Sequence, residues 1–145
     1  MATRRSSARW EGGLKGGKGT FKGESGAIGG QYSFSARFEE GVGSNPEELL
    51  AAAEAACFSM ALSGNLEKNG TVPTSIDTAA ACTIAPQPEG GVKITTIALD
   101  VVAVVAGIDD AKFQQIVKET LEGCPVSKTF RGNVELTANA KLGTA

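Results

Sequence analysis

Residues 45–66, NPEELLAAAEAACFSMALSGNL, predict the element on which the fold depends, a long apolar helix. Asn45 is a good N-cap residue and Pro46 suits the first helical position. Glu48 stands where a capping box places its carboxylate. We expect this helix to end at about Ser63 or Gly64, where the SGN sequence interrupts it.

The helix is apolar or small almost all round from residue 49 to residue 62, and Glu54 is the main exception. A helix without a wide polar stripe is typical of a buried element. Its many alanines also allow a neighbouring backbone to approach closely, which suits a helix–helix or subunit contact. The same stretch carries a thiol, Cys57, which could serve packing or chemistry.

The segments before this helix predict short strands. Residues 12–30 are rich in glycine and indicate tight turns between strands. Gly12, Gly17 and Lys18 fit most of a phosphate-binding loop, but Gly19 follows and no strand–loop–helix context surrounds them. Residues 31–39, QYSFSARFE, alternate apolar and polar side chains and predict a strand with one buried face. Arg37 would lie on its polar face.

The segments after the helix predict two strands, two helices and a last strand. Residues 75–86 and 91–107 read as strands joined by PQPEGG. Asp109 or Asp110 would cap a helix that ends at Gly123. Pro125 could open a further helical turn with Cys124 at its N-cap, and residues 133–142 would close the chain as a strand. We therefore expect a single α+β domain over residues 1–145.

Composition and charge exclude several classes of function. The net charge is −2 and the basic residues are scattered, which argues against a nucleic-acid partner. The basic N-terminus precedes no apolar run, so no signal peptide is expected. We expect no segment to approach the roughly 20 apolar residues of a membrane span. These features predict a cytoplasmic protein without a membrane partner.

The supply of ligands and catalytic bases is also limiting. The chain has three cysteines and no histidine, too few ligands for an ordinary zinc site, and we expect neither metal nor cofactor. Hydrolases of the Ser-His-Asp and Cys-His types are excluded because their nucleophiles would lack a base.

The three thiols differ in what their surroundings predict. Cys82 lies in an apolar strand and is expected to pack as a small hydrophobe. Cys124 would stand at a helix N-terminus, where the helix dipole lowers a thiol pKa. Burial of Cys57 would raise its pKa and make it inert unless a cation stabilises the thiolate. Arg37 is a candidate for that cation, although composition alone favours a solvated surface arginine.

At this point the chain resembles a known family, the OsmC/Ohr proteins of osmotic induction and organic hydroperoxide resistance. The resemblance rests on SARFEEGVGSNPEELLAAAEAACFSMALS, on TVPTSIDTAA and on the distal CPVSK, and it covers nearly the whole chain. Order and spacing are similar to the OsmC branch. The resemblance implies an OsmC-like fold, in which antiparallel sheets wrap two central helices of an intertwined homodimer.

The resemblance also implies an activity and four site residues. Cys57 matches the peroxidatic cysteine, Cys124 the resolving cysteine, Arg37 the arginine beside the thiolate, and Glu47 the glutamate that holds this arginine. The implied activity is reduction of organic hydroperoxides and hydrogen peroxide in oxidative and osmotic stress defence. The reductant would be a dithiol, for which a lipoyl-type group is the candidate.

One difference from many relatives, Glu54 in place of an early histidine, would add a negative charge near the pocket. The resemblance assigns no role to Cys82.

Helix geometry adds an inference about assembly. Glu47 and Cys57 lie ten positions apart on one helix, about 15 Å along its axis. An arginine held by Glu47 would therefore serve the Cys57 of another subunit, which predicts a homodimer with composite sites.

Two other readings stay open at the level of sequence. The protein could be a redox sensor or binding protein that oxidises once without turnover, or a structural dimer with inert thiols.

Overall fold

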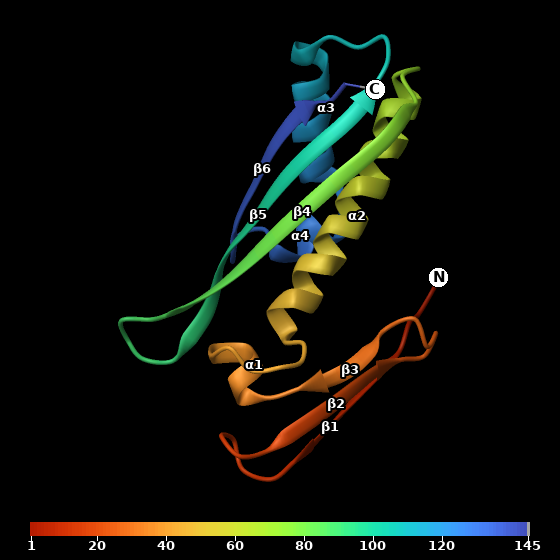
Figure 1. Cartoon of the computed structure of the whole chain (residues 1–145). Helices are drawn as coiled ribbons and strands as arrows, with labels where there is room; N and C mark the ends of the chain where they lie inside the picture. The colour runs from red at the N-terminus through yellow and green to blue at the C-terminus, as the bar shows by residue number, and fades with distance from the viewer. Residues whose placement is uncertain (145) are drawn as a thin grey trace. The chain divides into compact units, whose positions relative to one another are not determined.

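A computed structural model describes residues 1–144, and the chain in it divides into two compact units. The first unit is Met1–Leu49 and the second begins at Leu50. Each unit contains one three-stranded sheet and helices, so the predicted α+β class is confirmed (Figure 1). That residues 1–145 form a single domain stays a prediction.

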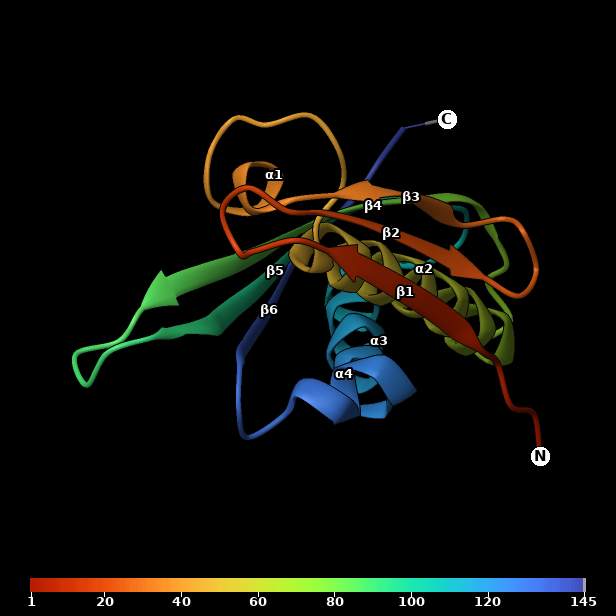
Figure 2. The ribbon, with the colours of Figure 1, turned by 90° about the horizontal axis from the view of Figure 1, so that it is seen from below.

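The first unit is built on an antiparallel sheet of three short strands in chain order. These are β1 (Ser6–Glu11), β2 (Lys18–Gly23) and β3 (Gly29–Tyr32), visible side by side in Figure 2. The glycine-rich segment forms their turns, as predicted, and Gly12 takes a positive φ of 90° where β1 turns toward β2. The fragment that resembles a phosphate loop is thus a hairpin turn.

The strand predicted over residues 31–39 is wrong beyond Tyr32. β3 ends there, and α1 (Phe34–Phe38) follows as a short helix. Ser33 caps it by accepting a hydrogen bond from the Ala36 N–H at 3.1 Å. The rings of Phe34 and Phe38, four residues apart, then pack at a tilt with centroids 4.9 Å apart. Arg37 therefore projects from a helix and not from a strand.

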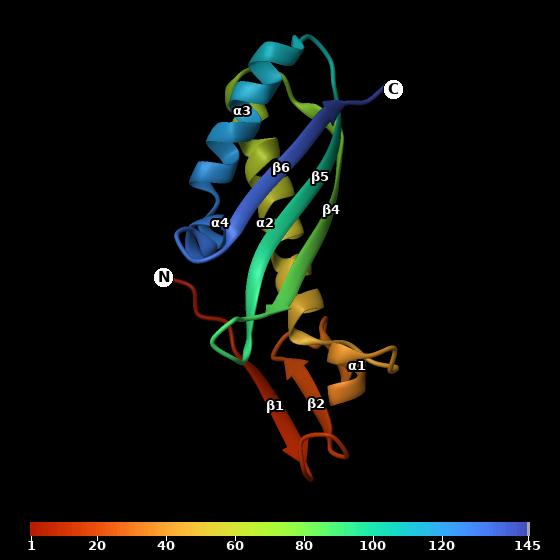
Figure 3. The same ribbon diagram turned by 90° about the vertical axis from the view of Figure 1, so that its left-hand side faces the viewer.

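The second unit contains a mixed sheet covered on one face by helices (Figure 3). Strands β4 (Pro73–Pro86) and β5 (Val92–Val105) pair antiparallel, as predicted, whereas β5 and β6 (Glu135–Leu142) pair in parallel. The crossover from β5 to β6 carries α3 (Asp110–Gly123) and α4 (Pro125–Phe130), both predicted. Asp109 is the N-cap of α3 and accepts from the Lys112 N–H at 2.8 Å.

The long helix α2 (Pro46–Lys68) begins where the sequence predicts and ends later. Asn45 Oδ1 accepts from the Glu48 N–H at 2.8 Å, which confirms the N-cap. The predicted end at Ser63 or Gly64 is wrong because tertiary contacts extend the helix. Asn65 donates to Thr120 Oγ1 of α3 at 2.9 Å, and Leu66 is fully buried.

One face of α2 helps to build the core of the second unit. Phe58, Leu62 and Leu66 repeat every four residues, are all fully buried, and join side chains of β5, α3 and β6. The opposite face is different: Ala52, Ala53, Ala56 and Met60 are exposed within one chain. The helix expected to be buried all round is therefore buried on one side only.

Contrary to the expectation from sequence, α2 is long and apolar enough to cross a membrane by length and composition. The core helix of a soluble protein passes the same test, and the fully buried stripe of α2 packs on protein. Length and composition therefore do not make α2 a membrane span.

Candidate functional site

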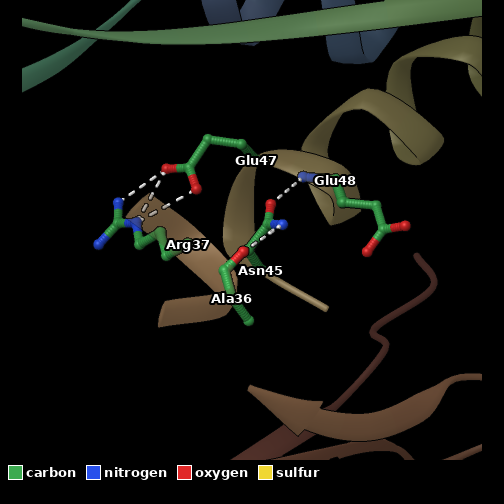
Figure 4. Close-up of polar contacts among 5 residues, drawn as sticks. All are labelled: Ala36, Arg37, Asn45, Glu47 and Glu48. Carbon is green, nitrogen blue, oxygen red and sulfur yellow. Dashed lines mark hydrogen bonds and ion pairs between the residues drawn. The ribbon is translucent and has the colours of Figure 1, made fainter. Parts of the chain in front are cut away.

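Arg37 and Glu47 form a tight ion pair in the first unit (Figure 4). Arg37 Nη2 lies 2.7 Å from Glu47 Oε1, and Nε lies 3.2 Å from both carboxylate oxygens. Glu47 is nearly buried, in the first turn of α2, where the helix dipole favours a negative charge. The carboxylate therefore fixes the guanidinium on one side and leaves Nη1 without a bond to it.

An aromatic hollow of about 300 Å³ adjoins this ion pair within the first unit. The guanidinium carbon of Arg37 stands 5.0 Å from the centre of the Phe38 ring, within cation–π range. The lining residues are Trp10, Leu14, Tyr32, Ser33, Phe34, Arg37, Phe38 and Pro46. The hollow thus combines apolar walls with one cationic group, a combination suited to a ligand with an apolar body and a polar end.

Cys57 and Cys124 meet in the second unit. Cys57 is half-buried on α2, Cys124 is buried at the N-cap of α4, and neither is in a disulfide. Their sulfur atoms share a hydrogen bond across 2.8 Å. A disulfide needs about 2.05 Å, so a shift of less than about 1 Å would bring the two sulfurs to bonding distance once an oxidant removes two electrons.

The surroundings of Cys57 within its own unit oppose ionisation. Burial is the largest effect that raises the pKa of the Cys57 thiol, and the hydrogen bond with Cys124 raises it further. The backbone N–H of Val126 acts in the opposite direction. A reactive thiolate therefore needs an additional cation, as the sequence already suggested.

Glu54 lies one helical turn before Cys57 and is fully buried. Its Oε1 accepts a hydrogen bond from Ser127 Oγ of α4 at 2.5 Å, whereas Oε2 is buried without a partner among residues 1–144. Burial raises the pKa of Glu54, against a smaller lowering by the Ser127 hydrogen bond. Burial therefore acts against the extra negative charge that we expected from sequence.

Replacing Glu54 by Gln should remove a pH dependence of stability. The folded protein holds the Glu54 proton more tightly than the unfolded chain, so its free energy of unfolding falls as pH rises through the raised pKa. The loss begins above the ordinary glutamate pKa of about 4.3.

We expect wild type to lose stability relative to Glu54→Gln over this window, because Gln has no proton to release. Urea unfolding under reducing conditions, in steps from acid to mildly alkaline pH, measures the difference. Parallel curves for the two proteins would contradict it.

The structure thus brings the predicted site residues together as two pairs, one in each unit. Arg37 joins Glu47 in the first unit, and Cys57 joins Cys124 in the second. Sequence reasoning missed the bond of Glu54 to Ser127, whose only sequence signal was one acidic residue in an apolar helix. Over residues 1–144, no cluster of three or more Cys, Asp or Glu could hold a metal.

Comparison with known proteins identifies the family. Residues 39–139 match the OsmC family, described as OsmC-like protein. The chain is also 45% identical, over 139 residues, to the peroxiredoxin OsmC of Escherichia coli, covering 95% of this chain and 96% of that protein. The chain belongs to the OsmC family. The resemblance noted in the sequence is therefore confirmed.

The Ohr proteins are similar too, in sequence and in structure. OhrB of Bacillus subtilis, an organic hydroperoxide resistance protein, is 34% identical over 108 residues, 74% of this chain and 76% of OhrB. The crystal structure of Bacillus subtilis OhrB superposes with a TM-score of 0.74 at 28% identity, covering 97% of this chain and 98% of that one. The OsmC-like fold is thereby confirmed.

Proposed function

We propose that this member of the OsmC family is a cysteine-based peroxidase that reduces organic hydroperoxides, and hydrogen peroxide as well. The observation that carries the proposal is the 2.8 Å contact between Cys57 and Cys124. Two thiols this close can together supply the two electrons that reduce a peroxide, and they become a disulfide in doing so. Relatives named peroxiredoxin and organic hydroperoxide resistance protein support the same activity.

The proposed reaction has two steps in the protein. The Cys57 thiolate attacks the terminal peroxide oxygen and breaks the O–O bond, and the alkoxide takes a proton to leave as an alcohol, or as water from hydrogen peroxide. Cys57 is then a sulfenic acid. The Cys124 thiol condenses with it to form a disulfide and release water, before further oxidation to the sulfinic acid. A dithiol reductant, for which a lipoyl-type group is the candidate, would restore both thiols by exchange.

Arg37 would supply the cation that Cys57 lacks in its own unit. A guanidinium beside the sulfur favours the thiolate and can donate hydrogen bonds to the peroxide as charge develops on the leaving oxygen. The bond of Glu47 to Nε and Nη2 supports this role, because it holds the guanidinium and leaves Nη1 for the reacting atoms. Arg37 and Glu47 thus complete the proposed catalytic set.

The aromatic hollow beside Arg37 supports a preference for organic hydroperoxides. Its walls include Trp10, Leu14 and Phe34, which suit an apolar substrate body, while Arg37 would receive the polar peroxide end. Hydrogen peroxide has no such body and would gain nothing from these walls.

The proposed assembly is a homodimer with composite sites. The exposed Ala52, Ala53, Ala56 and Met60 give α2 an apolar face without a partner in one chain. Small side chains on such a face permit close helix contact with a second copy. The ten residues between Glu47 and Cys57 support a site that takes its arginine from the partner. Cytoplasmic location and a part in oxidative and osmotic stress defence belong to the same proposal.

Repeated turnover with a dithiol reductant tests the function. Reduced protein with cumene hydroperoxide and excess dihydrolipoamide should consume many equivalents of peroxide, and mass spectrometry should find a Cys57–Cys124 disulfide when the reductant is left out. Consumption that stops after about one equivalent per subunit would favour the sensor reading. No consumption, with Cys57 unaltered, would refute the peroxidase and leave the thiols as inert packing residues.

A further inference from the structure

A polar pair runs parallel to the cysteine pair in the second unit. Glu54 precedes Cys57 by three positions on α2, and Ser127 follows Cys124 by three positions at the start of α4. Each residue on α2 bonds to its counterpart across the two helices, sulfur to sulfur and carboxyl to hydroxyl. The contact between the thiols is thus accompanied by a second polar contact one helical turn away.

The position of Glu54 makes its polarity conspicuous. Glu54, Phe58, Leu62 and Leu66 form one stripe of α2, spaced by four and all fully buried. An apolar residue at position 54 would continue this stripe. Glu54 instead leaves its Oε2 buried without a hydrogen-bond partner among residues 1–144. Burying such a group costs stability. We therefore expect the bond between Glu54 and Ser127 to have a role that offsets this cost in stability.

Ser127 is well placed to anchor α4. Within the six residues of α4, it is the one buried residue, and its hydroxyl points into the interior toward Glu54. Cys124 makes no side-chain capping bond to α4, so capping does not fix its sulfur. The Ser127 hydroxyl therefore ties the start of α4 to α2, next to the sulfur that must reach Cys57.

We propose that Glu54 is a positioning residue for disulfide formation, which through Ser127 holds Cys124 within bonding reach of Cys57. The proposal deepens the peroxidase function and rests on it for its biological use. Cys57 gains an oxygen when it becomes a sulfenic acid, and Cys124 must then approach without α4 drifting away. The Glu54–Ser127 bond limits that drift.

The neutral form of Glu54 suits this role. Besides its bond to Ser127, Glu54 acts electrostatically on the thiol of Cys57. An ionised Glu54 would raise the pKa of Cys57 and oppose its thiolate. A protonated Glu54 keeps the acceptor oxygen for Ser127 and adds no negative charge.

The effective concentration of the two thiols for one another tests the proposal without any peroxide. In glutathione buffers, the reduced protein and oxidised glutathione exchange to give the Cys57–Cys124 disulfide and two reduced glutathione molecules. The equilibrium constant measures how well the fold holds the sulfurs together.

We expect this effective concentration to fall about fivefold to tenfold in Ser127→Ala and in Glu54→Ala, as the loss of one hydrogen bond predicts. Glu54→Gln keeps the acceptor oxygen and should stay within about twofold of wild type. Thr129→Ala is the matched control, because it removes an exposed hydroxyl that, among residues 1–144, donates within α4 to the Pro125 carbonyl.

Two outcomes would overturn the proposal. One is an unchanged equilibrium constant in both alanine variants, and the other is a Gln variant as impaired as Glu54→Ala. If one alanine variant fails to fold, the equilibrium constants of the other alanine variant and of Glu54→Gln still test the proposal. Because the exchange needs no peroxidase chemistry, a failed peroxidase test would not disturb this result.

A second readout separates positioning from stability. Dimedone trapping after rapid mixing with cumene hydroperoxide should find Cys57 sulfenic acid formed at the wild-type rate in Ser127→Ala. The same variant should reach the sulfinic acid at lower peroxide than wild type, since resolution is slower. Equal sensitivity to over-oxidation would contradict the proposal.

Discussion

Replacing Arg37 by Met should lower kcat/KM for cumene hydroperoxide by about 100- to 1000-fold, the range seen when one preorganised charge-stabilising donor is removed. Within its own unit, Cys57 has a pKa raised by burial and by Cys124, so a thiol without a guanidinium stays protonated at neutral pH. The pH profile of Cys57 alkylation should accordingly move to higher pH in this variant.

The control for this variant is another arginine of the same unit. Arg9 makes an exposed ion pair with Glu11 at 3.2 Å, and Arg9→Met should keep nearly full activity. Glu47→Gln should lie between the two, because Gln binds a guanidinium through one neutral oxygen and holds it less firmly. An Arg37→Met protein with wild-type kcat/KM and an unshifted alkylation profile would remove arginine from the mechanism.

Mixing two inactive variants tests which chain supplies the arginine. If each site combines Cys57 of one chain with Arg37 of the other, heterodimers of Arg37→Met and Cys57→Ser chains contain one intact site. Random exchange of subunits should then restore about a quarter of the wild-type activity. If both residues act within one chain, no mixture regains activity.

The second half of the fold could be predicted because local rules decide it. Asp109 caps α3, Pro125 opens α4 and Gly123 ends α3, each by the chemistry of one residue. The strand predicted over residues 91–107 is also found as β5, and its burial alternates because its sheet has one face on the core. Such signals are read from neighbours in sequence alone.

The errors arise where two local readings compete or where distant contacts decide. The aromatics at 34 and 38 fit both a strand face and one turn of helix, and the Ser33 cap selects the helix. The continuation of α2 past Gly64 depends on the bond of Asn65 to Thr120, 55 positions away. Neither local propensity nor period contains that information.

The candidate site likewise contains residues that the sequence could predict and one that depends on a distant contact. Cys57, Cys124, Arg37 and Glu47 could be proposed from the family motifs, and in the structure they form two pairs, Cys57 with Cys124 and Arg37 with Glu47. Their catalytic roles stay a prediction. Ser127 could not be predicted, because its partner Glu54 lies 73 positions away. A serine near the start of a helix is common and gives no signal of such a bond. Only the packing of α4 against α2 makes that hydroxyl meaningful.

Cys124→Ser should leave the first chemical step intact and stop the cycle after it. Cys57 would still reduce about one equivalent of peroxide per subunit, but a serine hydroxyl cannot condense with the sulfenic acid. Turnover with a dithiol should fall about 100-fold or more, because an external thiol replaces a sulfur held 2.8 Å away.

The variants around Cys124→Ser make the result specific. Cys57→Ser should consume no peroxide at all, whereas Cys82→Ala should turn over nearly as wild type, since Cys82 packs at the edge of the core. Intact-mass spectrometry should find Cys57 as sulfenic acid in the Cys124→Ser protein and as sulfinic acid after excess peroxide. Sustained wild-type turnover without Cys124 would mean that the reductant attacks the sulfenic acid directly. The contact between the two sulfurs would then be a feature of packing, and resolution would take place between protein and reductant.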